Sequence, residues 1–116
     1  MNIEVFYEYC MSLPGVSEDF PFNENTLVFK VMGKMFALTD VDEFESINLK
    51  CDPVKALELR ASYEEIQPGY HMSKKHWNTI TMDGFLEDEL ILELIRHSYN
   101  LVVAKLPKKD REKLKT

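Results

Sequence analysis

The chain has 116 residues, of which 45% are hydrophobic and 11% aromatic, and its formal net charge is −6. This composition is too apolar for a disordered chain, and the length suits a single domain, residues 1–116, with one core. The longest aliphatic run, Leu101–Ala104, is far too short to span a membrane, and the first fifteen residues lack lysine and arginine, so we expect no membrane segment, no secretory signal and a cytoplasmic location.

The first predicted element is an amphipathic helix. Asn2 is a suitable N-cap, because its side-chain oxygen can accept a hydrogen bond from the first turn. Pro14 and Gly15 should end the helix, since proline disfavours helical backbone at the residue before it. The apolar side chains between these limits recur at helical spacing: Ile3, Phe6, Tyr7, Cys10 and Met11.

A β region follows. Residues 27–32 and 35–39 flank Gly33 and predict a hairpin. A charged connection leads to residues 46–51, where Ile47, Leu49 and Cys51 alternate with polar side chains. This strict alternation predicts a half-buried strand.

A second helix is predicted to start at Asp52 and Pro53, an N-cap carboxylate followed by proline at the first helical position. It should extend to about Ala61. Residues 63–68 are expected to lead into another β segment, and residues 77–82, rich in Thr and Ile, predict a further strand.

The last long helix is predicted over residues 86–104 from its apolar stripe, and Pro107 should end it. Residues 108–115 are expected either to form a short terminal helix or to fray. The predicted order is α, β-meander, α, β, α, with short connections. This order indicates an α+β fold in which an antiparallel sheet carries helices on one face.

No catalytic motif is present, so we expect a protein that is not an enzyme. Cys10 and Cys51 are interpreted as buried thiols, with a reactive thiol as the alternative. The acidic residues 40–45 are interpreted as a solvated loop, because the oxygen-ligand spacing of a calcium loop is missing. A zinc site from Cys51, His71 and His76 would follow no known ligand spacing, so neither a metal nor a cofactor is expected.

Two segments are basic on this acidic background. Residues 68–82 carry two lysines and no acid, and residues 105–116 carry six basic residues against two acids. The first segment also concentrates side chains that can contact phosphates and bases: Tyr70, His71, Lys74, Lys75, His76, Trp77 and Asn78. The alternative interpretation is a turn and strand in which Trp77 anchors the core and the lysines keep an edge soluble.

At this point the sequence resembles the MmcQ/YjbR family of small bacterial proteins. The blocks that carry the resemblance follow one another along nearly the whole chain: LPGV (13–16), EDFPF (18–22), LVFKV (27–31), GKMF (33–36), NLKCDP (48–53), PGYHMSKKHWNT (68–79) and SYNLVVAKLPKK (98–109). The resemblance implies an antiparallel α+β fold, related in shape to type III secretion chaperones and compared with frataxin.

The resemblance also implies DNA binding through a "double wing" arrangement of β elements. The residues it suggests as nucleic-acid contacts are Lys74, Lys75, His76, Trp77, Asn78, Lys108 and Lys109. A pI near 5.0 is unusual for a DNA-binding domain, so binding would be local, weak and sensitive to salt.

A non-catalytic binding protein is therefore expected, with DNA as the favoured ligand. The alternative is an adaptor for a protein partner, which would need an exposed apolar patch. A small-ligand or metal-binding protein is less favoured and would need a concave pocket. The DNA hypothesis depends on whether residues 68–82 and 105–116 meet in the fold.

Overall fold

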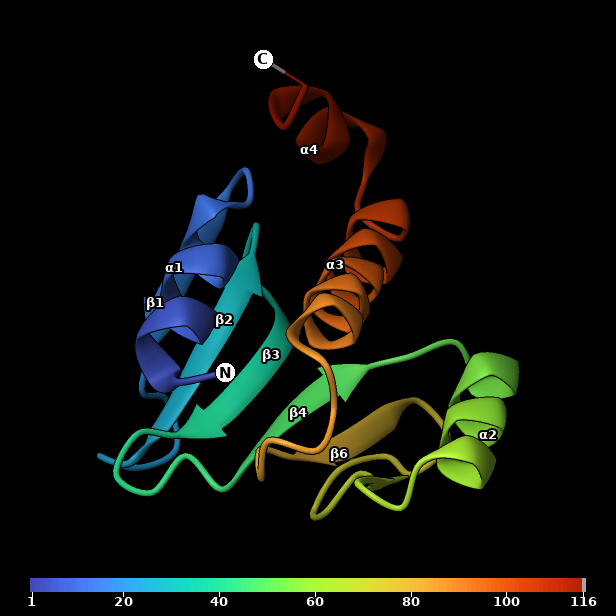
Figure 1. Ribbon diagram of the computed structural model, residues 1–116. Helices are drawn as coiled ribbons and strands as arrows, with labels where there is room; N and C mark the ends of the chain where they lie inside the picture. The colour runs from blue at the N-terminus through green and yellow to red at the C-terminus, as the bar shows by residue number, and fades with distance from the viewer. Residues whose placement is uncertain (116) are drawn as a thin grey trace.

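The computed structural model describes residues 1–115 and confirms the α+β prediction. Figure 1 shows one antiparallel sheet with helices packed around it. In chain order the elements are α1 (Ile3–Ser12), β1 (Val16–Asp19), β2 (Thr26–Val31), β3 (Lys34–Asp40), β4 (Ser46–Lys50), α2 (Pro53–Ser62), β5 (Ile66–Pro68), β6 (Trp77–Thr81), α3 (Asp88–Ala104) and α4 (Lys108–Lys113).

The sheet has six strands in the order β1-β2-β3-β4-β6-β5, and every neighbouring pair is antiparallel. Strands β1 to β4 form a meander, while β6 reaches β4 only after the α2–β5 excursion. Strand β1 was not predicted, because its sequence, VSED, has no apolar alternation and its side chains are mostly exposed. It pairs with β2 from Val16 to Asp19 and forms one edge of the sheet, and β5 forms the other.

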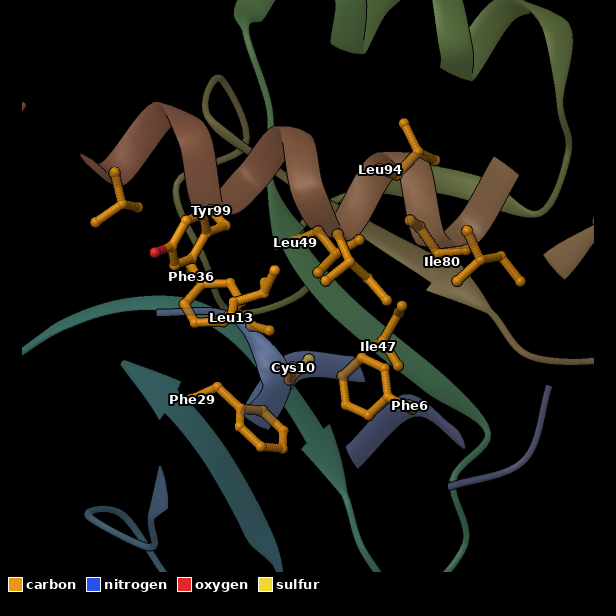
Figure 2. Close-up of a cluster of buried hydrophobic side chains, with 14 of the residues drawn as sticks. Phe6, Cys10, Leu13, Phe29, Phe36, Ile47, Leu49, Ile80, Leu94 and Tyr99 are labelled. Carbon is orange, nitrogen blue, oxygen red and sulfur yellow. The ribbon is translucent and has the colours of Figure 1, made fainter. Parts of the chain in front are cut away.

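The main core lies between one face of the sheet and helices α1 and α3 (Figures 1 and 2). Phe6 of α1 meets Phe29 of β2 edge-to-face, with ring centroids 5.5 Å apart. Phe36 of β3 and Tyr99 of α3 make a second such pair at 5.5 Å. Aromatic pairs in this geometry stabilise a core beyond the area that they bury.

Ser98 joins α3 to the sheet within this core. A bulge in the β2–β3 pairing leaves Phe36 without a partner residue on either neighbouring strand. The hydroxyl of Ser98 donates to the Phe36 carbonyl at 2.6 Å and accepts from the Lys50 N–H at 2.9 Å. One buried side chain thus satisfies two backbone groups at the end of the sheet.

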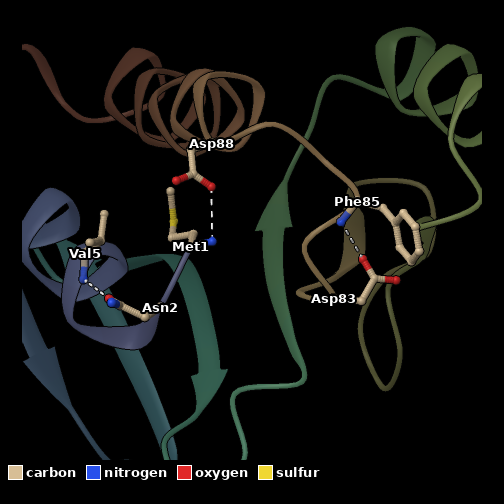
Figure 3. A network of polar contacts seen from close by, with 6 residues as sticks. All are labelled: Met1, Asn2, Val5, Asp83, Phe85 and Asp88. Carbon is tan, nitrogen blue, oxygen red and sulfur yellow. Dashed lines mark hydrogen bonds and ion pairs between the residues drawn. The ribbon is translucent and has the colours of Figure 1, made fainter.

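Polar contacts fix the start of the chain against α3 (Figure 3). The side chain of Asn2 accepts from the Val5 N–H at 2.9 Å, as predicted for the α1 N-cap. The amino group of Met1 lies 3.1 Å from the Asp88 carboxylate in the first turn of α3. Asp83 caps the preceding turn by accepting from the Phe85 N–H at 3.1 Å.

The opposite face of the sheet carries a smaller apolar cluster. Val28 and Leu38 project to this side because side chains alternate along a strand, and Trp77 packs with them. Met35 and Met72 cover the cluster in part. None of the helices in residues 1–115 is long and apolar enough to cross a bilayer.

Candidate functional site

The loop between β5 and β6 carries most of the predicted contact residues. It leaves the sheet at Pro68 and returns at Trp77, and the Gly69 N–H donates to the Trp77 carbonyl at 2.8 Å to close its base. A side chain at Gly69 would place its Cβ 2.8 Å from the Cβ of Trp77, so glycine is needed for this close approach.

Arg60 of α2 holds this loop from the side. Its Nε donates to the Asn78 side-chain oxygen at 2.8 Å, and its Nη2 donates to the carbonyls of Trp77, at 3.1 Å, and Lys74. A guanidinium that reaches three acceptors in this way fixes the second half of the loop and the start of β6. The loop is therefore positioned by α2 as well as by the sheet.

Two of the predicted contact residues are interior residues. Trp77 is 7% exposed and packs on Val28 and Leu38, and Asn78 is 2% exposed and engages Arg60. Most of the surface of both side chains is thus used inside the protein, and their contact with DNA stays a prediction. For Trp77, the alternative interpretation as a core anchor describes the structure.

The other predicted residues lie at the surface. Lys74 and Lys75 are exposed on the loop, and His76 is half-buried beside them. The ammonium of Lys74 donates to the Gly69 carbonyl at 3.2 Å, which holds it close to the loop. Lys108 and Lys109 are exposed in the first turn of α4.

A pocket of about 340 Å³ takes lining residues from both basic segments, although Lys74, Lys75, Lys108 and Lys109 are not among them. It opens at the end of the sheet where β3 and β6 begin and β4 ends, next to the last turn of α3. We call it the lysine pocket, and its lining residues are Lys34, Met35, Lys50, Trp77, Val102, Lys105, Leu106 and Pro107. The first basic segment contributes Trp77, and the second contributes Lys105 to Pro107.

The lysine pocket is cationic at its rim and apolar inside. Lys34, Lys50 and Lys105 form no ion pair with any residue from 1 to 115, and the lining contains no acid. Three ammonium groups around an apolar wall can bind an anion whose remainder is apolar or aromatic.

Sequence reasoning missed these three lysines. Lys34 was interpreted only as part of a hairpin turn, and Lys50 only as the polar side of an alternating strand. The register pairs Lys50 with Trp77 across β4 and β6, a neighbourhood that sequence distance conceals. The one sequence feature that could have indicated the pocket was the position of Lys50 and Lys105 at the ends of a predicted strand and a predicted helix.

The cysteines and histidines do not form a second site. Burial raises the pKa of both thiols, Cys10 and Cys51, which disfavours the reactive thiolate form. His97, whose pKa burial lowers, accepts a hydrogen bond from the Asp52 N–H at 3.2 Å. Within residues 1–115, no three His, Cys, Asp or Glu side chains are placed to hold a metal ion.

An aromatic patch lies on the sheet face opposite the main core. It surrounds a shallow pocket of about 410 Å³ whose walls include Phe22, Tyr70, His71 and Met72. Phe22 is 63% and Tyr70 70% exposed, and the rings of Tyr70 and His71 lie 4.0 Å apart. An exposed aromatic surface of this kind is typical of binding sites.

Comparisons with known proteins indicate one family over most of the chain. The model of the YjbR family matches residues 11–101. YbdF of Escherichia coli O157:H7 is 40% identical over 106 residues, which cover 90% of this chain and 87% of YbdF. YjbR of Escherichia coli K12 is 32% identical over 115 residues and 98% of both chains. Both relatives are described as uncharacterized.

Two crystal structures share the fold. Protein DR2400 of Deinococcus radiodurans, a DUF419 domain, superposes with a TM-score of 0.90 at 43% identity, over 97% of this chain and 87% of that one. A protein from Pseudomonas syringae superposes with a TM-score of 0.72 at 28% identity, over 87% of this chain and 98% of that one.

Proposed function

The chain belongs to the YjbR family, and from this premise we propose that it is a non-catalytic bacterial protein that binds DNA at the lysine pocket and the basic segments beside it. Its place would be the cytoplasm, where DNA is available to a bacterial protein. The relatives on which the bacterial assignment rests come from Escherichia coli and Bacillus subtilis.

One observation carries this proposal: three lysines without an ion pair among the described residues converge on one pocket of an acidic protein. Exposed lysines without an ion pair are common in this chain, so the support comes from the convergence of three of them on one pocket. Unneutralised ammonium groups on a concave surface concentrate anions there. The exposed Lys74, Lys75, Lys108 and Lys109 add positive charge to the two segments that contribute Trp77 and Lys105 to the pocket.

The size of the charged site sets the expected salt dependence. With three phosphate contacts, a fourfold rise in salt should weaken DNA binding by about 20-fold to 40-fold, for single strands and duplexes respectively. The net charge of −6 adds repulsion outside the pocket, so the affinity should be low at physiological salt.

Fluorescence anisotropy of labelled DNA across a salt series tests the proposal. We expect Lys50→Gln to weaken binding, and the matched variant Lys55→Gln to leave it unchanged. Lys55 carries the same charge but lies on α2, 3.8 Å from Glu93 and outside the pocket. An absence of binding at low salt, or equal effects of the two variants, would refute the proposal.

A protein partner is the second candidate, and the aromatic patch favours it. A second copy of the chain is the simplest partner to test, by sedimentation of the purified protein. Phe22→Ser should then abolish self-association, whereas Phe85→Ser, which alters an 81% exposed ring outside the patch, should not. A monomer at all concentrations would count against a second copy.

A further inference from the structure

The inside of the lysine pocket is suited to a flat or apolar group and not to a phosphate. Met35, Trp77, Val102, Leu106 and Pro107 make five of its eight lining residues apolar. A duplex backbone running over the rim would meet only the lysines, and it would leave this apolar surface in water. The apolar wall is used only when a flat or apolar group enters beneath the charges.

Trp77 also carries a donor that the described part of the protein does not use. Its indole N–H has no acceptor among residues 1–115, and no side-chain nitrogen or oxygen buried there is unsatisfied, so this N–H remains open to solvent. An indole with one buried side and one open donor can contact an aromatic ring and also donate a hydrogen bond. The Met35 thioether adds a polarizable group that is favourable beside an aromatic ring.

The dimensions restrict the occupant to a small unit. A volume of about 340 Å³ lies at the lower end of the range for small-molecule pockets, so it can hold one base and not a base pair. The rim lysines come from β3, β4 and the end of α3, and they surround the opening on more than one side. This arrangement can neutralise the phosphates on either side of one base.

We propose that the lysine pocket takes one unpaired nucleotide of a DNA strand, with its base against Trp77 and Met35 and its phosphates on Lys34, Lys50 and Lys105. This inference rests on the proposed function and deepens it. Single strands and duplexes with an unpaired end should therefore bind more tightly than blunt duplexes, because bases within a duplex are stacked and cannot enter the pocket. A free nucleotide shares this chemistry, but it lacks the second phosphate and should bind more weakly.

The sole tryptophan of the chain makes the test direct. Trp77 emission, excited at 295 nm, reports entry into the pocket, and anisotropy of a labelled oligonucleotide reports binding anywhere on the protein. Four probes are compared at low salt: a thymidine 12-mer, a blunt 12-base-pair duplex, the same duplex with a three-nucleotide overhang, and thymidine monophosphate. We expect the 12-mer and the overhang to change both signals at the same concentrations, and the blunt duplex to bind about tenfold more weakly.

Variants at the rim supply the control. Lys34→Gln with Lys105→Gln alters two exposed side chains, so the fold should persist, and we expect about a tenfold loss of single-strand affinity at low salt. Lys55→Gln with Arg96→Gln removes the same charge outside the pocket and should weaken binding much less than the rim variant, because these charges act on the DNA only through the longer-range field.

The outcomes separate this inference from the proposed function. Equal binding of all three oligonucleotides without a change in Trp77 emission would overturn the pocket assignment but leave DNA binding intact. Saturation by thymidine monophosphate at the concentration that the 12-mer needs would also overturn it, in favour of a free-nucleotide site. No anisotropy change with any DNA would overturn both.

Discussion

Ser98→Ala should destabilise the protein far more than the loss of one hydroxyl suggests. Ser98 is fully buried, and its hydroxyl serves the Phe36 carbonyl and the Lys50 N–H together. Alanine would leave both backbone groups without a partner in a place that water does not reach. Each unsatisfied buried group costs about 1–3 kcal/mol, so we expect the free energy of unfolding to fall by about 3 kcal/mol.

Urea and thermal unfolding measure this loss. The change corresponds to a decrease of about 10 °C or more in the melting temperature of a domain of this size. Ser12→Ala is the matched control, because the Ser12 hydroxyl makes one local hydrogen bond, to the Tyr9 carbonyl, at the exposed end of α1. The control should change the unfolding free energy by less than about 0.5 kcal/mol.

A small effect of Ser98→Ala would refute the reasoning. If the two variants differ by less than about 1 kcal/mol, the bulged part of β3 must find other hydrogen bonds, and Ser98 would only fill space. A large effect with an unchanged urea m-value would confirm that the folded state is altered, since the m-value follows the surface exposed on unfolding.

Two further predictions concern the contacts that α2 and its N-cap make with the rest of the fold. Arg60→Met should lower the free energy of unfolding by about 2–4 kcal/mol, since it leaves the buried Asn78 oxygen without its donor. Arg96→Met, on the exposed side of α3, should cost little. Equal melting temperatures of the two variants would show that Arg60 does not hold the loop between β5 and β6. The second prediction concerns His97, whose pKa is lowered from its ordinary value of 6.5 by burial first and by Lys55 second, against the opposing charges of Asp52 and Glu93. The unfolded state therefore gains the proton first as pH falls below the ordinary value, and stability should decrease from there until pH passes below the folded pKa. Urea midpoints at pH 7.5 and 5.5 should differ less in His97→Gln than in the original protein, and an unchanged difference would rule out this histidine as the cause.

Elements with a repeating pattern or a cap could be predicted from the sequence. The stripe from Ile3 to Met11 and the N-cap at Asn2 gave α1, and the alternation of residues 46–51 gave β4. The resemblance to the YjbR family is confirmed by the family match. Strand β1 was missed because pairing with β2, and not its own side chains, makes it a strand.

The site was harder to predict because the composition of a segment does not determine which of its side chains point inward and which point to solvent. Trp77 and Asn78 stand beside Lys74 and Lys75 in the sequence, yet the first two turn inward and the lysines stay outside. The lysine pocket instead assembles side chains from three strands and a helix end. Only the strand register and the course of α3 bring them together, and neither can be obtained from residue types alone.

The edges of the sheet determine how the molecule behaves at high concentration. Strand β1 presents the exposed acids Glu18 and Asp19, and β5 is three residues long and ends at Pro68, which has no N–H to donate. An incoming strand would meet charge repulsion at one edge and too few hydrogen bonds at the other. The fold is thus protected against strand-by-strand growth into fibrils, and an assembly of copies would use surfaces other than the sheet edges.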